Sequence, residues 1–328
     1  MPDYLVNRRR ALALGAAFCL VPTLARADAP SRLTLDYAYY NPLSLLLREK
    51  GWVEEALAEQ GTDVRWVLSL GSNRALEFLA GGSIDLGSTA GGAALVGRAN
   101  GNPIRSIYLY SRPEWTALVT RPDTGIASVA DLKGKTIAVT RGTDPHLFLL
   151  QALAAHGLSE RDVRTVLLQH PDGGRALVSR QVDAWAGLDP HMAQHELRDG
   201  VILFHRAPEL NTYGVLNVRE AFAARHPATV RRVLEAYERA RVHARANPDE
   251  LADILARAAR LDPDVARLQL EARTDLEVAA IDAPVQATLL AAGQVLQEIG
   301  VIRPEVDVPA LLVGLVDTTF TDQLATAG

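Results

Sequence analysis

The sequence predicts an α/β protein with two lobes, each built on a parallel or mixed β-sheet that is covered by helices. Short β-rich segments alternate with helical segments in two sets, residues 31–110 and 116–212, and a helical return follows to the C-terminus. This alternation is typical of sheets whose two faces are both buried. A chain of 328 residues is also long enough for two hydrophobic cores.

Composition limits the classes of function. The chain has 34 Lys and Arg against 39 Asp and Glu, a net charge of -5, which argues against a nucleic-acid partner. With 48% hydrophobic and 22% charged residues, the composition is that of a globular protein. Cys19 is the one cysteine, so neither a disulfide framework nor a thiolate metal site can form. We expect no cofactor, because no dinucleotide or phosphate-loop pattern is present.

Residues 1–27 have the features of an export signal. Arg8, Arg9 and Arg10 precede an apolar stretch over residues 11–24, and Ala25-Arg26-Ala27 offers small residues for cleavage after Ala27. The paired arginines resemble a twin-arginine signal. The alternative is an uncleaved membrane anchor, for which the apolar stretch is short. We therefore expect the mature chain to lie outside the cytoplasm.

The first set of segments begins with a strand over residues 33–38, where apolar and polar residues alternate. Pro42 opens a helix that Gly51 ends. Ser72 and Asn73 can cap the next helix. The remaining elements expected here are strands over 64–70, 84–87 and 104–110 and a helix of small residues over 91–99.

The second set repeats the alternation. Strands are expected over 116–120, 135–139, 164–168, 182–186, 201–205 and 213–218, with helices over 145–156, 174–179 and 190–198. Trp185 is expected in the core of a strand. From Arg219 onward the chain is rich in alanine and divided by prolines, so helices are expected.

Small polar residues follow most of the predicted strands. Open α/β sheets bind ligands beyond the carboxyl ends of their strands. Several of these segments also begin helices, whose first N–H groups lack partners and attract a small anion. Each serine or threonine could instead be an ordinary helix cap, so the prediction depends on convergence at one cleft. The candidate ligand-binding residues are Tyr40, Asn41, Gly71, Ser72, Ser88, Thr89, Arg112, Arg141, Gly142, Thr143, His146 and Asp189.

Several motifs resemble the periplasmic aliphatic-sulfonate-binding proteins of ABC importers. The matching pieces are Tyr40-Asn41-Pro42, Gly71-Ser72, residues 82–87, residues 131–139, Arg141-Gly142-Thr143 with His146, and residues 181–186 before Asp189-Pro190. The 82–87 and 131–139 pieces are shared with nitrate, taurine and thiamine-precursor binders. Leu188 is a departure, because the sulfonate branch usually has Trp there.

The resemblance implies a type II periplasmic binding protein fold. The first lobe would hold residues 28–112 together with the return over 215–328, and the second lobe would hold 113–214. Two strands crossing near 111–115 and 211–215 would form the hinge. The implied protein is a monomeric receptor, with no catalytic activity, that carries a small anionic solute to permease subunits at the inner membrane.

The resemblance also suggests roles for the candidate residues. Ser72 and Thr143 would donate to the anion, one from each lobe, with Ser88, Thr89 and Asn41 as further donors and Tyr40 as a wall. Arg112 would grip a sulfonate through two N–H groups, or form a surface salt bridge. Arg141 is a similar but weaker candidate. Asp189 would face a substrate amine or cap the helix after Pro190.

Other functions remain open from the sequence. The same fold could bind nitrate, taurine or a thiamine precursor, could be a pyrimidine-synthase-like enzyme, or could be the sensor domain of a membrane kinase. His191 and His195 are one helical turn apart, as metal ligands can be, but two ligands are too few and a solvated helix face is the better interpretation.

Overall fold

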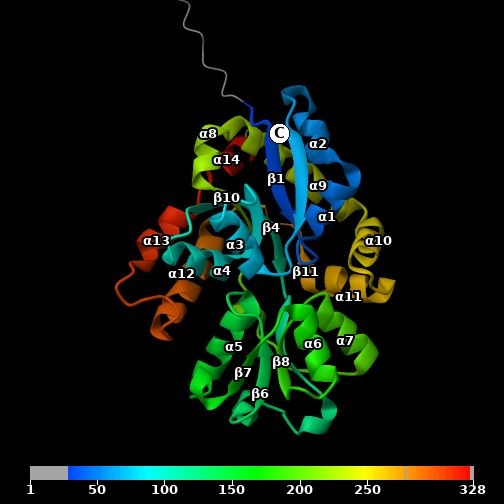
Figure 1. Ribbon diagram of the computed structural model, residues 1–328, viewed down its shortest axis with the longest axis vertical. Coiled ribbons are helices and arrows are strands. Elements are labelled where there is room, and N and C mark those ends of the chain that lie inside the picture. Colours follow the sequence, from blue (N-terminus) through cyan, green and yellow to red (C-terminus); the bar gives the residue numbers. More distant parts are fainter. Residues whose placement is uncertain (1–28, 278, 326–328) are drawn as a thin grey trace, which may run out of the picture.

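The computed structural model describes residues 29–277 and 279–325, and the expected export signal at 1–27 lies outside them. The chain forms two lobes that follow each other along its long axis (Figure 1). The first lobe is a six-stranded sheet with its helices, and the second is a five-stranded sheet with its helices. The predicted α/β fold with two mixed sheets flanked by helices is confirmed. Within the described ranges, no helix combines the length and apolar character needed to cross a bilayer.

The first sheet has the strand order β11-β4-β10-β3-β1-β2. Its strands are β1 (Arg32–Tyr37), β2 (Asp63–Leu68), β3 (Leu86–Ala90), β4 (Ile104–Pro113), β10 (Gly214–Arg219) and β11 (Thr274–Asp275). β1 pairs in parallel with β2 and β3, whereas β10 runs antiparallel to β3 and β4. Every residue of β3 is buried, as expected for a central strand covered on both faces.

The second sheet has the order β7-β6-β8-β5-β9. Its strands are β5 (Thr116–Thr120), β6 (Thr136–Val139), β7 (Arg164–Leu167), β8 (Ala184–Leu188) and β9 (Ile202–His205). β6 pairs in parallel with β7 and β8, and β5 runs antiparallel to β8 and β9. Trp185 on β8 is fully buried, as expected.

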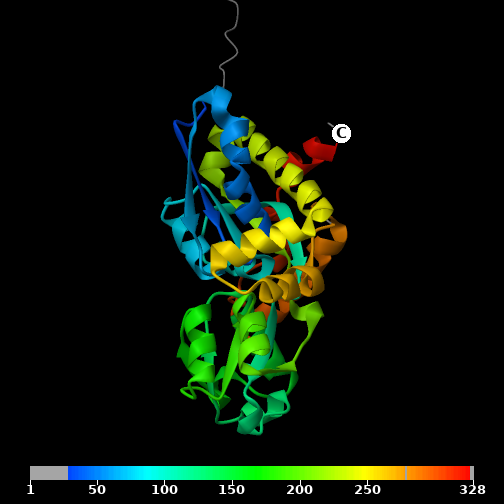
Figure 2. The ribbon, with the colours of Figure 1, turned by 90° about the vertical axis from the view of Figure 1, so that its right-hand side faces the viewer.

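Helices cover both faces of both sheets (Figures 1 and 2). The helices of the first lobe are α1 (Pro42–Lys50), α2 (Trp52–Leu57), α3 (Ser72–Ala80), α4 (Gly91–Ala99), α8 (Glu220–Arg225), α9 (Pro227–Ala246), α10 (Pro248–Ala259), α11 (Pro263–Arg273), α12 (Ala283–Glu298), α13 (Val308–Leu315) and α14 (Thr319–Ala325). Those of the second lobe are α5 (Asp144–Ala155), α6 (His170–Val178) and α7 (His191–Asp199). α1 begins at Pro42 and ends before Gly51, at φ 66°, as predicted. Asn41, which was predicted to bind a ligand, caps this helix through its side chain.

The chain crosses between the sheets twice. β4 ends at Pro113 and β5 begins at Thr116, and the return runs from the end of β9 at His205 to the start of β10 at Gly214. The two crossings are the covalent links between the lobes, in the region where the sequence predicts a hinge. The exact lobe boundaries stay a prediction.

Strand β3 lies further along the chain than expected. The sequence predicts a strand over 84–87 followed by a polar loop, but Ser88 and Thr89 are paired inside β3, opposite Leu216 and Val215 of β10. Small and β-branched residues fit this fully buried strand, and a larger residue at Gly87 would meet Ile84 and Leu79. Ser88 and Thr89 therefore belong to the sheet.

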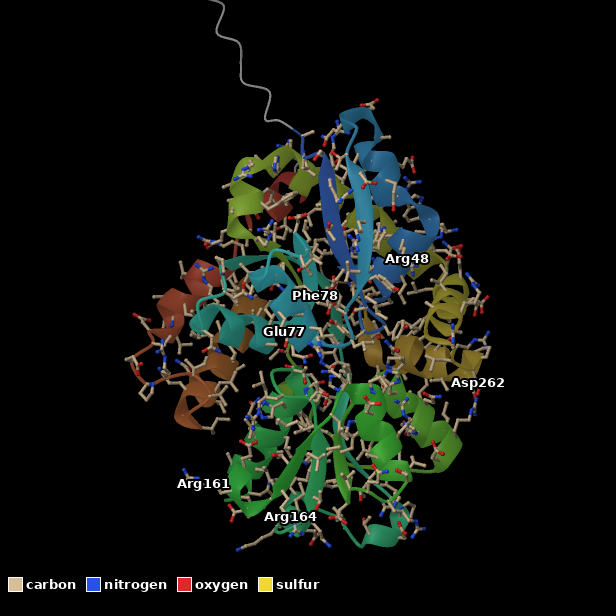
Figure 3. The ribbon with its side chains drawn as sticks, viewed as in Figure 1. Arg48, Glu77, Phe78, Arg161, Arg164 and Asp262 are labelled. Carbon is tan, nitrogen blue, oxygen red and sulfur yellow. The ribbon has the colours of Figure 1, made fainter. Side chains whose placement is uncertain are left out.

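Ion pairs join the lobes at the contact between α7 and α11. Arg273, which is 6% exposed, donates to both carboxylate oxygens of buried Asp189 at 3.2 and 3.3 Å and also to Glu196. Arg198 of α7 donates to Asp262, labelled in Figure 3, at 2.7 Å and to Asp264 at 2.5 Å. The Arg198 pairs are exposed and worth little individually, whereas the Arg273–Asp189 pair is desolvated.

Replacement of Arg273 by Met should lower the free energy of unfolding by about 3 kcal/mol, because Asp189 would remain buried without its partner. Urea denaturation measures the loss. Arg257→Met is the control, since its pair with Glu49 is exposed on both sides and should contribute less than about 1 kcal/mol. Equal losses in the two variants would contradict the assignment of a desolvated interlobe pair.

Candidate functional site

A small cavity lies between the two lobes. Its lining residues come from both sides: Tyr40 and Ser72 from the first lobe, and Trp115, Thr143, Asp144, Pro145 and Leu188 from the first crossing and the second lobe. Its empty volume is about 200 Å³, below the roughly 300–1,000 Å³ of pockets for drug-sized ligands. Side chains nearly fill this cavity, which leaves room for about one water molecule. The lobes therefore leave little empty space between them at this point.

Two helices begin at this cavity, one from each lobe. α3 starts at Ser72 after an extended Gly71, and α5 starts at Asp144 with Thr143 as its N-cap and Pro145 in the first turn. Because the first N–H groups of a helix have no partners within the helix, both ends carry donors and partial positive charge. Ser72 and Thr143, which the sequence analysis expects to converge, both line this cavity.

The two hydroxyl groups differ in what they can donate. Ser72 Oγ accepts from the backbone N–H of Ala90 at 3.0 Å, so its own proton remains free for another acceptor. Thr143 Oγ1 instead donates to the carbonyl of Thr140 at 2.6 Å. Thr143 can therefore serve a ligand through its backbone N–H, while Ser72 can offer its hydroxyl as well.

Aromatic and aliphatic side chains form the apolar wall. The rings of Tyr40 and Trp115 meet edge to face, with centroids 6.0 Å apart. Tyr40 donates its hydroxyl proton to the carbonyl of Ser88 at 3.1 Å, so the ring is fixed. Leu188 completes the lining at the position where the resemblance leads us to expect Trp. Trp115, which the sequence analysis did not select, supplies an indole from the first crossing.

Asp144 is a buried carboxylate that the sequence analysis also missed. It accepts from Trp115 Nε1 at 2.8 Å, from the Thr212 backbone N–H at 3.1 Å and from the Thr212 hydroxyl at 2.6 Å. Thr212 Oγ1 in turn accepts from the N–H of Gly92, in the first turn of α4. Burial raises the pKa of Asp144 to about 6, although these hydrogen bonds oppose the rise. Asp144 thus links α5, both crossings and α4.

Three predicted site residues belong to the interior of the first lobe and do not line the cavity. Asn41 donates to Ser88 Oγ at 2.7 Å, and Ser88 Oγ donates to Asp36 at 2.8 Å. Thr89 Oγ1 accepts from the side-chain amide of Asn217 at 2.8 Å. The expectation that Asn41, Ser88 and Thr89 donate to a ligand is therefore not supported, because their donors and acceptors hold the first lobe together.

Arg112 is also outside the cavity. It is exposed on β4 and lines a separate groove at the crossings, where its guanidinium lies 5.5 Å from the ring centroid of Tyr213. We call this the hinge groove; the carboxylates lining it are those of Glu114, Glu209, Glu271 and Asp275. These four acids outnumber the two arginines of the lining, Arg112 and Arg273, so the hinge groove does not favour an anion. The predicted contact of Arg112 with a sulfonate is therefore not supported.

Arg141, Gly142 and His146 lie beside the cavity, on an open groove between α4, α5 and the end of α12. Arg141 forms an exposed ion pair with Glu160 at 3.1 Å. It therefore stays the weaker candidate for binding the anion, as the sequence analysis expects. Gly142 approaches α3, because a Cβ placed on it would lie 3.6 Å from the Cβ of Asn73. Burial lowers the pKa of His146, so this histidine is neutral at pH 7.

Asp189 caps a helix, as one of its two interpretations proposed. Its carboxylate accepts from the N–H of Ala193 in the first turn of α7 at 2.9 Å and pairs with Arg273. Burial raises the pKa of Asp189 to about 6 despite Arg273. Among the residues the structure describes, no group of three or more His, Cys, Asp or Glu could hold a metal ion. His191, one of the two histidines whose spacing resembles that of metal ligands, is neutral at pH 7, because burial lowers its pKa to about 4.

Comparison with known proteins places the chain in a family. The model of the family described as NMT1/THI5 like matches residues 45–251. A Bacillus subtilis protein named an aliphatic sulfonates-binding protein is 30% identical over 224 residues, which cover 67% of this chain and 68% of that protein.

Solved structures share the fold. The alkanesulfonate-binding protein SsuA from Xanthomonas axonopodis pv. citri, bound to MOPS, superimposes with a TM-score of 0.78 at 24% identity, covering 88% of this chain and 99% of that one. The desulfurization enzyme DSZB has a TM-score of 0.66 at 17% identity, covering 91% and 99%. The fold therefore accommodates both binding and catalysis, and by the family match this chain belongs to the NMT1/THI5-like family.

Proposed function

We propose that this protein is an extracytoplasmic receptor that binds a small organic anion, most simply an aliphatic sulfonate, and delivers it to an ABC importer. The observation that carries the proposal is the start of two helices from opposite lobes at one buried cavity. Helix N-termini bind oxyanions through backbone N–H groups without a cationic side chain. The sulfonate-binding name of the Bacillus subtilis relative supports this choice of anion.

The cavity restricts the ligand in charge and in size. Asp144 is the carboxylate in its lining, so a monoanion such as a sulfonate is favoured over a dianion such as sulfate. Tyr40, Trp115 and Leu188 offer an apolar surface to a short carbon chain. Because a sulfonate does not fit into room for one water molecule, the ligand must enter while the lobes are apart.

Binding and lobe closure are then coupled. An anion held by N–H groups of both α3 and α5 contacts both lobes in the closed form and only one of them in an open form. The ligand therefore stabilises the closed form by its difference in affinity for the two, and the crossings act as the hinge. The closed, loaded receptor is the form that permease subunits would recognise.

Receptor function is also favoured over catalysis. DSZB shows that the fold can carry an enzyme. In this chain, however, Asp144, the carboxylate that lines the cavity, already accepts hydrogen bonds from Trp115 and Thr212, and none of the seven described lining residues is a cysteine or lysine. We propose a monomeric periplasmic protein exported by its N-terminal segment and devoid of catalytic activity.

Thermal unfolding with a ligand panel tests the anion class. A short alkanesulfonate at about 100 times its Kd should raise the unfolding midpoint by about 5 °C, because the ligand binds only the folded protein. The panel includes taurine, longer alkanesulfonates, an aryl sulfonate, nitrate, sulfate and thiamine precursors. Stabilisation by nitrate alone, or by an uncharged ring compound alone, would contradict the sulfonate assignment while leaving the fold untouched.

Replacement of Gly71 by Ala should weaken sulfonate binding about 10-fold. The added Cβ would lie 2.8 Å from Asn73 Oδ1 and 3.2 Å from His170 Nε2, so the lobes could close fully only with overpacking that costs about 1–3 kcal/mol. Isothermal titration calorimetry measures the affinity. Gly81→Ala, at the opposite end of α3, is the matched control and should bind as the wild type does. Unchanged affinity in Gly71→Ala would argue against closure at this contact.

Replacement of Arg112 by Ala should leave the affinity for a sulfonate within about 2-fold of the wild type, because its guanidinium lies in the hinge groove and not at the cavity. A direct contact with the anion would instead be worth about 1.5–3 kcal/mol, or at least 10-fold. The same calorimetric titration separates the two outcomes. A loss of 10-fold or more would move the anion site to the hinge groove.

A further inference from the structure

His170 is a buried side chain for which the fold itself supplies no hydrogen bond. It is the first residue of α6 and is fully buried. In the part of the chain that the structure describes, neither Nδ1 nor Nε2 of its ring has a hydrogen-bond partner. A neutral imidazole always carries one N–H donor and one acceptor, so both of its polar groups are left unmet.

Such an arrangement is costly in a folded protein. A buried donor or acceptor without a partner costs about 1–3 kcal/mol, and native proteins satisfy most of their buried polar groups. An apolar side chain would fill the same space at lower cost. Burial, with a smaller contribution from His191, lowers the pKa of His170 to about 3, so the ring is neutral at pH 7 and cannot relieve the cost by taking a charge.

The ring faces the first lobe at the start of α3. A Cβ placed on Gly71 would lie 3.2 Å from His170 Nε2 and 2.8 Å from Asn73 Oδ1, so two polar side chains from opposite lobes converge on this glycine. Asn73 Oδ1 is likewise buried without a partner. The next residue, Ser72, lines the interlobe cavity, so an oxygen held at the first N–H groups of α3 would lie beside the ring.

We propose that His170 is a ligand-binding residue, which donates its ring N–H from the second lobe to an oxygen of the bound anion. This inference rests on the proposed function, because the anion that enters between the lobes supplies the missing partner. A neutral donor suits a monoanionic sulfonate, since it adds a hydrogen bond without requiring proton uptake. α6 would then join α3 and α5 as the third helix beginning at the site.

Ligand titrations of three variants against the wild type test the assignment. Isothermal titration calorimetry with ethanesulfonate at pH 7.5 should show His170→Leu weakened about 10- to 100-fold, the range for a hydrogen bond to a charged group. His170→Gln keeps a donor and should stay within about 5-fold of the wild type. His205→Leu is the matched control, because its Nε2 is also buried without a partner but the ring packs against Phe148 and His156 inside the second lobe. It should bind within about 2-fold of the wild type.

A spectroscopic measurement covers the case in which His170→Leu does not fold. In wild-type protein labelled with ¹⁵N-histidine, ethanesulfonate should shift the ring resonances of His170, identified by their absence in His170→Gln, and leave those of His205 in place. Wild-type-like affinity in folded His170→Leu, or unmoved His170 resonances at saturation, would overturn the inference while the receptor function stands. Failure of the wild type to bind any sulfonate or nitrate would overturn both.

Discussion

The buried carboxylate of Asp144 fixes the geometry on which the interlobe cavity depends. It sits at the start of α5 and holds Trp115 of the first crossing and Thr212 of the second through three hydrogen bonds. Through the Thr212 hydroxyl it also reaches the N–H of Gly92 at the start of α4. Each hydrogen bond to a charged group is worth about 1.5–3 kcal/mol, so this one side chain sets where the second lobe meets the first.

The lobes contact each other near Asp144 through two different kinds of interaction. On one side, α7 and α11 are joined by ion pairs, of which the Arg273–Asp189 pair is desolvated and the Arg198 pairs remain in solvent. On the other side, the absence of a side chain at Gly71 lets α3 approach His170 closely. The helix N-termini and the rings of Tyr40 and Trp115 meet at the interlobe cavity. Among the residues that the structure describes, the lining of the cavity thus contains neutral donors and no cationic side chain.

Much of the fold could be predicted from the sequence, because alternation of apolar residues and helix signals such as Pro42 and Gly51 are local. Ser72 and Thr143, which both line the interlobe cavity, could be singled out for the same reason, since each stands at the start of a helix that follows a strand. Ser88 and Thr89 were misplaced by a shift in the position of β3, which turned predicted loop donors into strand residues. Arg112 follows Ser111 on a strand, where neighbouring side chains point to opposite faces, so its direction was not readable. The link between Asp144 and Trp115 could not be predicted, because hydrogen-bond partners 29 and 68 residues apart in the chain leave no local signal. The burial of His170 against Gly71 likewise depends on the contact between the lobes.

The most direct test of the account is a crystal structure of the protein with ethanesulfonate. The account predicts a sulfonate between the starts of α3 and α5, with its oxygens accepting from backbone N–H groups of both helices and its carbon chain against Tyr40, Trp115 and Leu188. A sulfonate bound beside Arg112 in the hinge groove, or one that contacts a single lobe, would contradict it.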